Sequence, residues 1–189
     1  MSPLITTKAG ASAGAYGWST ASAGQVASFE SIATFTGNGS SQAATFSSIP
    51  STFQHLQIRA AVVTASSGFS PDVRFNSDSG ANYQRLYIRV AGATQSTAGQ
   101  TATNQLALFP NGTAGINPST LIMNIFDYAS TSKYKMVQWT EAYLSAGAPM
   151  TVFSQGMWLN TAAITSIAFG TSDYTANNVI ALYGMKGAV

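Results

Sequence analysis

The chain has 189 residues, which suits one β-sandwich or β-barrel, and its 46% hydrophobic residues provide material for a core. Charged residues make up only 7%, against roughly a quarter in an ordinary globular domain. The eight basic residues are scattered and the net charge is only +2, so we expect no nucleic-acid partner. Because the sequence has no cysteine, disulfides and cysteine-ligated metal sites are excluded.

The low charge also bears on the surface of the protein. Ser, Thr, Asn, Gln and Gly must form the polar surface, and a monomer with so few charges is poorly protected against association. We therefore expect copies of the chain or other proteins to cover much of it, although secreted glycan-binding domains share this composition. Residues 1–8 lack the basic and apolar regions of a secretory signal, and no apolar run approaches the ~20 residues of a membrane span. We expect synthesis in a cytoplasm and no membrane insertion.

The first segment in chain order, residues 1–28, is rich in Ala, Gly, Ser and Thr. Its large aromatic residues are Tyr16 and Trp18, so it cannot bury enough apolar surface to stay compact by itself. It is either a disordered tail or an arm that becomes ordered against a neighbouring subunit. Because buried aromatic residues dominate interface energies, we predict an anchoring arm in which Tyr16 and Trp18 dock.

From Phe29 onward, short strands separated by turn residues are predicted, and no long stretch has helical spacing. Gly37-Asn38-Gly39 predicts a hairpin turn, whereas the low complexity of Ala91–Ala102 predicts a loop. For residues 29–189 we predict an all-β, antiparallel two-sheet sandwich of the jelly-roll type. The expected strands are 31–35, 43–49, 53–64, 83–90, 105–109, 120–128, 134–143, 151–153, 158–159, 164–169 and 178–185.

Two predicted strands show clear period-two alternation, which indicates one buried and one exposed face. In the strand 53–64 the apolar face consists of Leu56, Ile58, Ala60 and Val62. In the strand 83–90 we expect Leu86, Ile88 and Val90 to point inward and the stripe Tyr83, Arg85, Tyr87, Arg89 to point outward. Such a stripe suits sugar stacking or a subunit interface, and we favour the interface because Tyr and Arg are enriched there.

Few residues could support catalysis. His55 is the only histidine, and no Gly-x-Ser-x-Gly turn accompanies it, so we expect neither a Ser-His-Asp triad nor a histidine metal cluster. Asp127 and Glu141 fall on neighbouring predicted strands, as a glycosidase pair would require. Pairing with a nearby lysine, Lys133 or Lys135, or with an arginine is the ordinary alternative, and we predict no catalytic residue.

Oxygen ligands suited to calcium gather in one turn region, at Asp72, Asn76, Asp78 and Asn82. Turns are commonly rich in Asn and Asp, and a strong calcium site needs more carboxylates than this region offers. We therefore predict no metal and no cofactor.

Five stretches of the chain resemble, in the same order, a family of virion structural proteins of tailed bacteriophages that are often described as tail-fibre proteins. The resemblance spans residues 49–189, but Gln84–Val90 departs from the family pattern. It implies that the chain is a component of a phage particle, and it implies no catalytic or binding residues. The five stretches are IPSTFQHLQIR (49–59), VRFNSDSGANY (73–83), IFDYASTSKYK (125–135), GMWLNTAAITSI (156–167) and ALYGMKG (181–187).

The physical roles expected of these stretches are structural. Asp127 should cap a turn or pair with a lysine, Trp158 and Ile164 should lie in the core, and Ala181–Met185 should form a central strand. We therefore expect a non-enzymatic virion protein, anchored by residues 1–28 and forming a homotrimer on the particle surface. It would be a capsid decoration protein or a small fibre-like head or tail appendage. The alternative is a carbohydrate-binding module of a tail fibre or spike, with Trp139 and Trp158 as further sugar-stacking residues.

Overall fold

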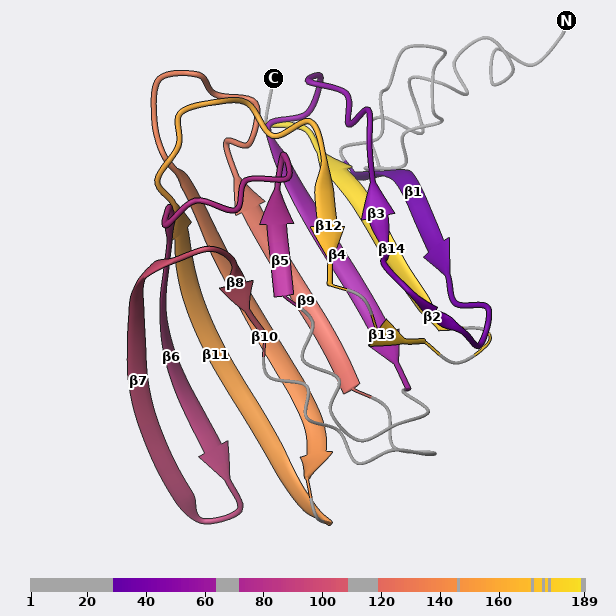
Figure 1. Cartoon of the computed structure of the whole chain (residues 1–189), viewed down its shortest axis with the longest axis vertical. Helices are drawn as coiled ribbons and strands as arrows, with labels where there is room; N and C mark the ends of the chain where they lie inside the picture. The colour runs from indigo at the N-terminus through magenta and orange to yellow at the C-terminus, as the bar shows by residue number, and fades with distance from the viewer. Residues whose placement is uncertain are drawn as a thin grey trace, which may run out of the picture.

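The computed structural model of the chain describes residues 29–63, 72–108, 119–145, 147–170, 172–174, 176 and 178–187. Within these ranges every regular element is a β-strand, and no helix that could cross a membrane is found there. The strands are β1 (Phe29–Thr36), β2 (Ser41–Gln42), β3 (Thr45–Phe46), β4 (His55–Val62), β5 (Asp72–Phe75), β6 (Tyr83–Ala91), β7 (Thr94–Thr103), β8 (Leu106–Ala107), β9 (Ser119–Phe126), β10 (Lys135–Ser145), β11 (Ala148–Trp158), β12 (Ile167–Phe169), β13 (Ser172–Asp173) and β14 (Val179–Met185) (Figure 1).

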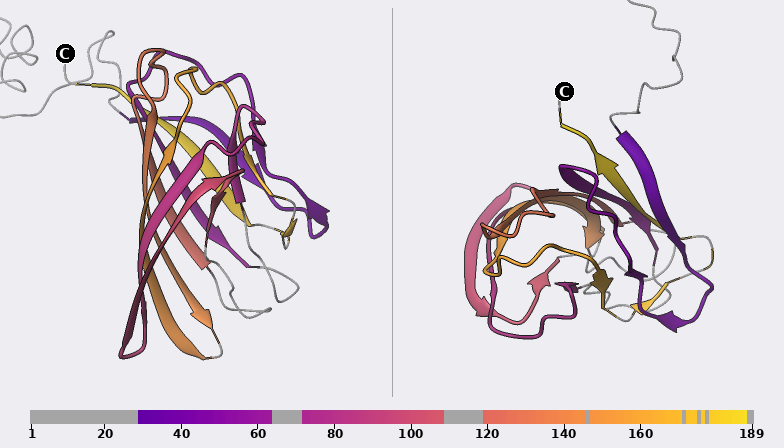
Figure 2. Two further views of the ribbon diagram at one scale, coloured as in Figure 1. Left: turned by 60° about the vertical axis from the view of Figure 1, so that its left-hand side comes forward. Right: turned by 90° about the horizontal axis from the view of Figure 1, so that it is seen from above.

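Two antiparallel sheets form the layers of a sandwich. The larger sheet has eight strands in the order β1-β14-β4-β9-β10-β11-β6-β7, and the smaller has four in the order β3-β12-β5-β8. A separate pair, β13 and β2, completes the described strands. The large sheet curves around one side of the small sheet (Figure 2). The predicted antiparallel two-sheet sandwich is confirmed, while the jelly roll is a finer prediction that this strand order does not establish.

Strand β4 shows how the sequence builds the core. Leu56, Ile58 and Val62 are buried between the sheets, whereas Gln57 and Arg59 point to the opposite face of the large sheet. This is the period-two pattern of a half-buried strand, and it confirms the alternation predicted for this segment. The next strand in the sheet, β14, lies between β1 and β4, so the strand predicted to be central is second from one edge.

Aromatic residues fill the space between the sheets near one end. Trp158 and Ile164 are buried, as predicted, and the Trp158 ring lies 5.7 Å from the ring of Phe75 and 6.4 Å from that of Tyr83. Gly156 on β11 leaves space for neighbouring side chains because it has no Cβ. A Cβ on Gly156 would lie 2.8 Å from the Leu106 side chain and 3.0 Å from the Trp139 ring, so glycine at this position of β11 lets both side chains pack closely against the strand.

The segment Gly37-Asn38-Gly39 does not form the predicted hairpin. It joins β1, in the large sheet, to β2, in the separate pair. The Gly37 and Gly39 N–H groups donate to the carbonyls of Asn178 and Tyr174, both distant in sequence. A glycine-rich turn signal indicates where the chain reverses, but it does not determine which strand the following residues pair with.

Three other predictions about strands are wrong. Residues 94–103, expected as loop, form the edge strand β7, which pairs with β6 after a turn at Gly92 (φ +57°). Residues 148–158 form one strand, β11, where two short strands were expected. Residues 72–75 form β5, which was not expected. These segments are very short or lack an alternation of apolar and polar residues. They are strands because they pair with neighbouring strands, and their own sequences do not predict it.

Both ends of the described chain leave from the same end of the sandwich. Phe29, the first residue of β1, is paired with Met185, the last residue of β14. The loops 47–54, 76–82, 127–134 and 159–166 gather at this end, together with residues 186–187 (Figure 1). We refer to this part of the molecule as the loop end.

Candidate functional site

The stripe predicted to point outward on β6 points inward instead. Tyr83 is 0% and Arg85 7% exposed, and Tyr87 and Arg89 are half-buried on the same side. The Tyr83 hydroxyl accepts a hydrogen bond from the Phe75 backbone N–H, and the Arg85 guanidinium donates to the Ala107 carbonyl. Aromatic and guanidinium groups can be buried once their polar atoms find such partners, and this reverses the predicted faces of the strand.

Arg85 and its neighbours form a polar cluster on the inner face of the large sheet. The Arg85 guanidinium lies 4.9 Å from the centre of the Tyr87 ring, and Trp139 Nε1 donates a 2.7 Å hydrogen bond to the buried Glu141 carboxylate. Burial lowers the pKa of Arg85, and the negative charge of Glu141 partly offsets this lowering. Burial also raises the pKa of Tyr143. The electrostatic effects of Glu141 on Arg85 and of Arg89 on Tyr143 connect β10 with β6 inside the sandwich, which is a structural role.

Three of the aromatic residues that were expected to stack on a sugar are buried. Tyr83 is fully buried, and Trp139 and Trp158 are 1% exposed, so none of these rings can stack on a sugar. The possible glycosidase pair is also separated. Glu141 faces inward from β10, whereas Asp127 lies in the 127–134 loop and accepts a 2.6 Å hydrogen bond from Lys133 Nζ.

At the loop end, Asp78 joins two of the stretches that resemble phage proteins. Its Oδ2 atom accepts hydrogen bonds from Trp158 Nε1 (2.7 Å) and Asn82 Nδ2 (2.9 Å), and its Oδ1 atom accepts one from the Gly80 N–H (2.8 Å). Partial burial would raise the pKa of Asp78, but these hydrogen bonds outweigh it and hold the pKa below its usual range. The carboxylate thus anchors the indole of the core residue Trp158.

Asn76 performs a similar task for the 159–166 loop. Its Oδ1 atom accepts hydrogen bonds from the backbone N–H groups of Thr165 and Ser166, and its Nδ2 donates to the Ala163 carbonyl. Of the residues considered for calcium, Asp72 lies instead on β5, paired with Ala107. Within the described ranges, no group of three His, Cys, Asp or Glu residues is suitably placed for a metal ion.

His55 and Asp127 connect two further loops at this end. His55 Nδ1 accepts a 3.0 Å hydrogen bond from the Asp127 backbone N–H, and its ring lies edge-on to Phe126. The hydrogen bond from Lys133 is the main reason why the pKa of Asp127 is lowered. The predicted pairing of Asp127 with a lysine is confirmed. Asp127 has a positive φ of 47°, a conformation that these contacts hold in place.

The opposite surface of the large sheet has a different character. Leu86, Phe153 and Ile122 are 61%, 55% and 50% exposed, and Ile88 and Met136 are nearly as exposed. We call this surface the outer face and define it by the outward-pointing residues of four neighbouring strands, none of which is charged. They are Thr120, Ile122, Asn124 and Phe126 on β9; Met136, Gln138, Thr140 and Ala142 on β10; Thr151, Phe153, Gln155 and Met157 on β11; and Gln84, Leu86, Ile88 and Val90 on β6.

Strand pairing arranges these side chains in rows that run across the sheet. One row consists of amides, because Asn124 is paired with Gln138 and Gln138 with Gln155, and β4 extends it with Gln57. Gln57 Nε2 donates a 2.7 Å hydrogen bond to Asn124 Oδ1, and Leu86 continues the row on β6. The flanking rows are mainly apolar. They are Phe126, Met136, Met157, Gln84 on one side and Ile122, Thr140, Phe153, Ile88 on the other.

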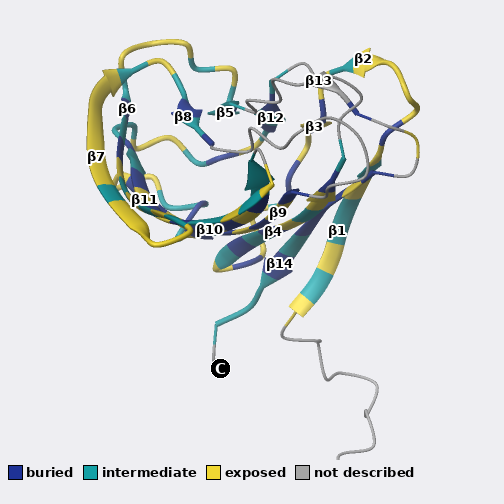
Figure 3. Cartoon of the chain, turned by 90° about the horizontal axis from the view of Figure 1, so that it is seen from below, coloured by how far each residue is buried: buried dark blue, intermediate teal, exposed yellow. Residues whose placement is uncertain are grey.

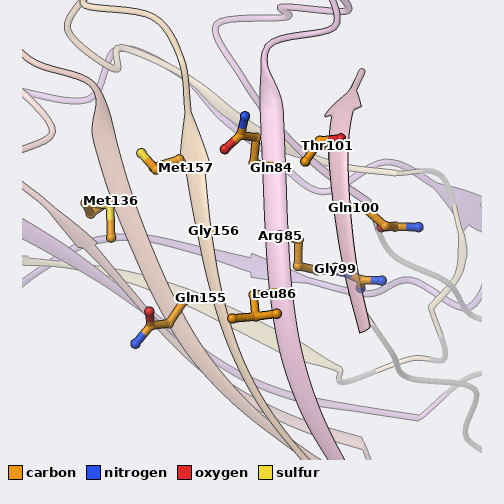
Figure 4. A pocket seen from close by; sticks show the side chains of 10 residues that line it. All are labelled: Gln84, Arg85, Leu86, Gly99, Gln100, Thr101, Met136, Gln155, Gly156 and Met157. Carbon is orange, nitrogen blue, oxygen red and sulfur yellow. The ribbon is translucent and has the colours of Figure 1, made fainter. Parts of the chain in front are cut away.

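Shallow hollows lie between the protruding side chains. One of about 310 Å³ lies beside Leu86, between Met136 and Met157 on one side and Gly99 and Thr101 of β7 on the other (Figure 4). Neighbouring hollows of about 540 and 430 Å³ share Leu86 and Ile122 with the rest of the outer face. Exposed and buried residues alternate along β10, and most of β7 is exposed (Figure 3). The outer face is therefore a surface of protrusions and hollows without charged residues on its four strands, and the exposed Arg59 of β4 borders it beside Ile122.

The four residues of β6 that were predicted to form a subunit interface face inward, and Gln84, Leu86, Ile88 and Val90 occupy the outward side of that strand. The sequence did contain a signal for the outer face, because Leu121–Phe126 is apolar at almost every position. A run that is apolar on both faces is typical of a strand buried on both faces. Tyr16 and Trp18, predicted to anchor an arm, lie outside the described residues.

Comparisons with known proteins found no match among protein-family models, curated proteins or solved structures.

Proposed function

We propose that this protein is a non-enzymatic structural component displayed on the surface of a tailed-bacteriophage particle. The observation that carries the proposal is the outer face, an uncharged and largely apolar surface over four strands. Monomeric proteins seldom expose such a surface unless it binds another molecule. The low charge of the whole chain and the resemblance of its five stretches to virion structural proteins support the same role.

The chemistry of the polar residues supports a structural rather than a catalytic role. His55 and Asp78 join segments that are distant in the sequence, through a backbone N–H group and an indole, and Asp127 accepts a hydrogen bond from Lys133 of its own loop. Glu141 is buried with Trp139 on the inner face. Groups engaged in this way are poorly placed to bind a substrate, because binding would require these contacts to break.

The arm 1–28 is proposed to anchor the protein to the particle. It enters the described structure at Phe29, beside the C-terminal strand and at the loop end, whereas the outer face covers the middle of the large sheet. Anchoring through Tyr16 and Trp18 and contacts through the outer face would therefore use different parts of the molecule. The homotrimer expected from the sequence is a separate prediction, and the two-fold contact inferred below is an alternative to it.

The test is to locate the protein on particles. Antibodies raised against the chain should label the surface of intact tailed phages that encode it, and quantitative mass spectrometry should find it in purified virions. Hundreds of copies per particle would indicate capsid decoration, and a few dozen or fewer would indicate a tail or fibre. Absence from purified virions would contradict the proposal.

Deleting residues 1–28 tests the anchor. The body should keep its melting temperature, because every described strand begins at or after Phe29, yet the truncated protein should be missing from particles. The matched control is the full chain with Tyr16→Ala and Trp18→Ala, which should show the same loss. Normal incorporation of the truncated protein would refute the anchoring role.

A further inference from the structure

We infer that the outer face pairs with the same face of a second copy of this chain about a two-fold axis. The inference rests on the proposed function in that it assumes an assembling protein, and it adds the surface and the partner. Three properties of the face carry it: its size, the order of its rows and its lack of charge.

The size of the apolar surface is that of a stable interface. A buried aromatic side chain covers about 150–250 Å², so the half-exposed Phe153 offers on the order of 100 Å². With the other exposed residues, namely Leu86, Ile88, Val90, Ile122, Phe126 and Met136, the apolar area is on the order of 500 Å². A standard interface buries about 800 Å² per partner, somewhat more than half of it apolar. The outer face alone therefore supplies the apolar area of a standard interface.

The amide row favours an identical partner over a different one. Each amide has both a donor and an acceptor, so a row of Asn124, Gln138 and Gln155 can hydrogen-bond to an identical row. A partner with a charged surface would gain no ion pair here, and burying its charges would be unfavourable. A second copy brings the same four strands without charged outward residues, and its Arg59 lies at the border of the face, beside Ile122.

The order of the rows allows the outer faces of two copies to pack together with like rows in contact. The amide row lies between two mainly apolar rows, one containing Met136 and the other Phe153. A two-fold axis in the plane of the face, either along the amide row or perpendicular to it, places amides over amides in both cases. It also places apolar rows over apolar rows. A two-fold contact uses the same patch on both partners, which is the requirement that this pattern fulfils.

The first experiment measures mass in solution. Light scattering after size-exclusion chromatography should give a mass of two 19.6 kDa chains for the full-length protein at micromolar concentration. Phe153→Lys should reduce the mass to that of one chain, because it places a charge in the centre of the contact. The matched control is Tyr134→Lys, at a residue that is 53% exposed in the 127–134 loop and should leave the dimer intact.

The second experiment uses charge to test that the partner is a copy. Gln138→Glu and Gln138→Lys should each give monomers, since like charges would face each other across the axis. An equimolar mixture of the two variants should recover the dimer mass, with one chain of each kind in the complex. Such recovery requires that the amide row of one copy lies on the amide row of the other.

Two sets of results would overturn the inference. One is a wild-type mass of one or three chains. The other is a dimer that Phe153→Lys does not disrupt, or whose two charged variants do not recover on mixing. Thermal melting of each variant shows whether it is folded. Because these masses are measured on the isolated protein, a negative result would leave the particle-labelling test untouched, and a failure of that test would leave the dimer untouched.

Discussion

The loop end and the outer face use their side chains in opposite ways. At the loop end, Asp78, Asn76 and His55 each bind groups from distant parts of the chain, so their polar atoms serve contacts within the fold. On the outer face, Leu86 and Phe153 point away from the body and have large exposed fractions.

The stretches that stand out in the sequence and the residues exposed on the outer face lie in different parts of the molecule. The distinctive stretches of this sequence, such as VRFNSDSGANY and GMWLNTAAITSI, belong to the loop end, where they hold the sandwich together. The outer face consists of ordinary Gln, Thr, Met and Ile residues in the middle of strands. Changes at the loop end should therefore affect stability, and changes on the outer face should affect association.

Trp158→Ala should have the largest effect on stability. The residue is buried against Phe75 and Tyr83, and large aromatic-to-alanine changes in a core typically cost about 3–5 kcal/mol. Chemical denaturation should show this loss in the free energy of unfolding. A loss within about 0.5 kcal/mol, the ordinary range of surface substitutions, would place Trp158 outside the core.

Gly184→Ala should destabilise the protein by about 1–3 kcal/mol, the usual cost of overpacking. A Cβ at this position would lie only 2.3 Å from the Phe53 ring, which packs against β14 at the loop end. The double variant Gly184→Ala, Phe53→Leu should lose less than the two single variants added together. Additive losses would show that the ring and the glycine are not in contact.

Asp78→Asn should cost about 1–3 kcal/mol at neutral pH, because an amide has one oxygen where the carboxylate accepts from three donors. The pKa of Asp78 is lowered in the folded protein, so its stabilising effect is present above the unfolded pKa of about 3.9 and is lost as the pH falls through the folded value. Urea denaturation between neutral pH and pH 2.5 should therefore show a weaker acid destabilisation in Asp78→Asn.

The control for this variant is Glu30→Gln, which breaks the partly exposed ion pair with Lys186. Exposed pairs contribute roughly 0–1 kcal/mol, so its stability at neutral pH should stay close to that of the wild type. If Asp78→Asn loses stability in acid as steeply as the wild type, the hydrogen bonds to Asp78 do not depend on its charge.

Phe153→Ala should have the smallest effect on folding, within about 0.5 kcal/mol, as is usual for exposed positions. The same variant should weaken self-association, measured as a shift of the dissociation to higher protein concentration. Together with Trp158→Ala it separates the two regions, because one variant changes stability and the other changes association. A large loss of stability in Phe153→Ala would mean that the outer face is part of the core of the monomer.

The fold class, the alternation of β4 and the core position of Trp158 could be predicted from the sequence, because each depends on local periodicity or on a large apolar side chain. The buried face of β6 could not, since Arg85 and Tyr83 are buried through hydrogen bonds with Ala107 and Phe75, which lie on other strands. The tertiary structure also decided that residues 94–103 form a strand, because their pairing with β6 replaces a missing pattern. The amide row likewise arises from register, which aligns Asn124, Gln138 and Gln155 from three strands, and no spacing along the chain encodes that alignment.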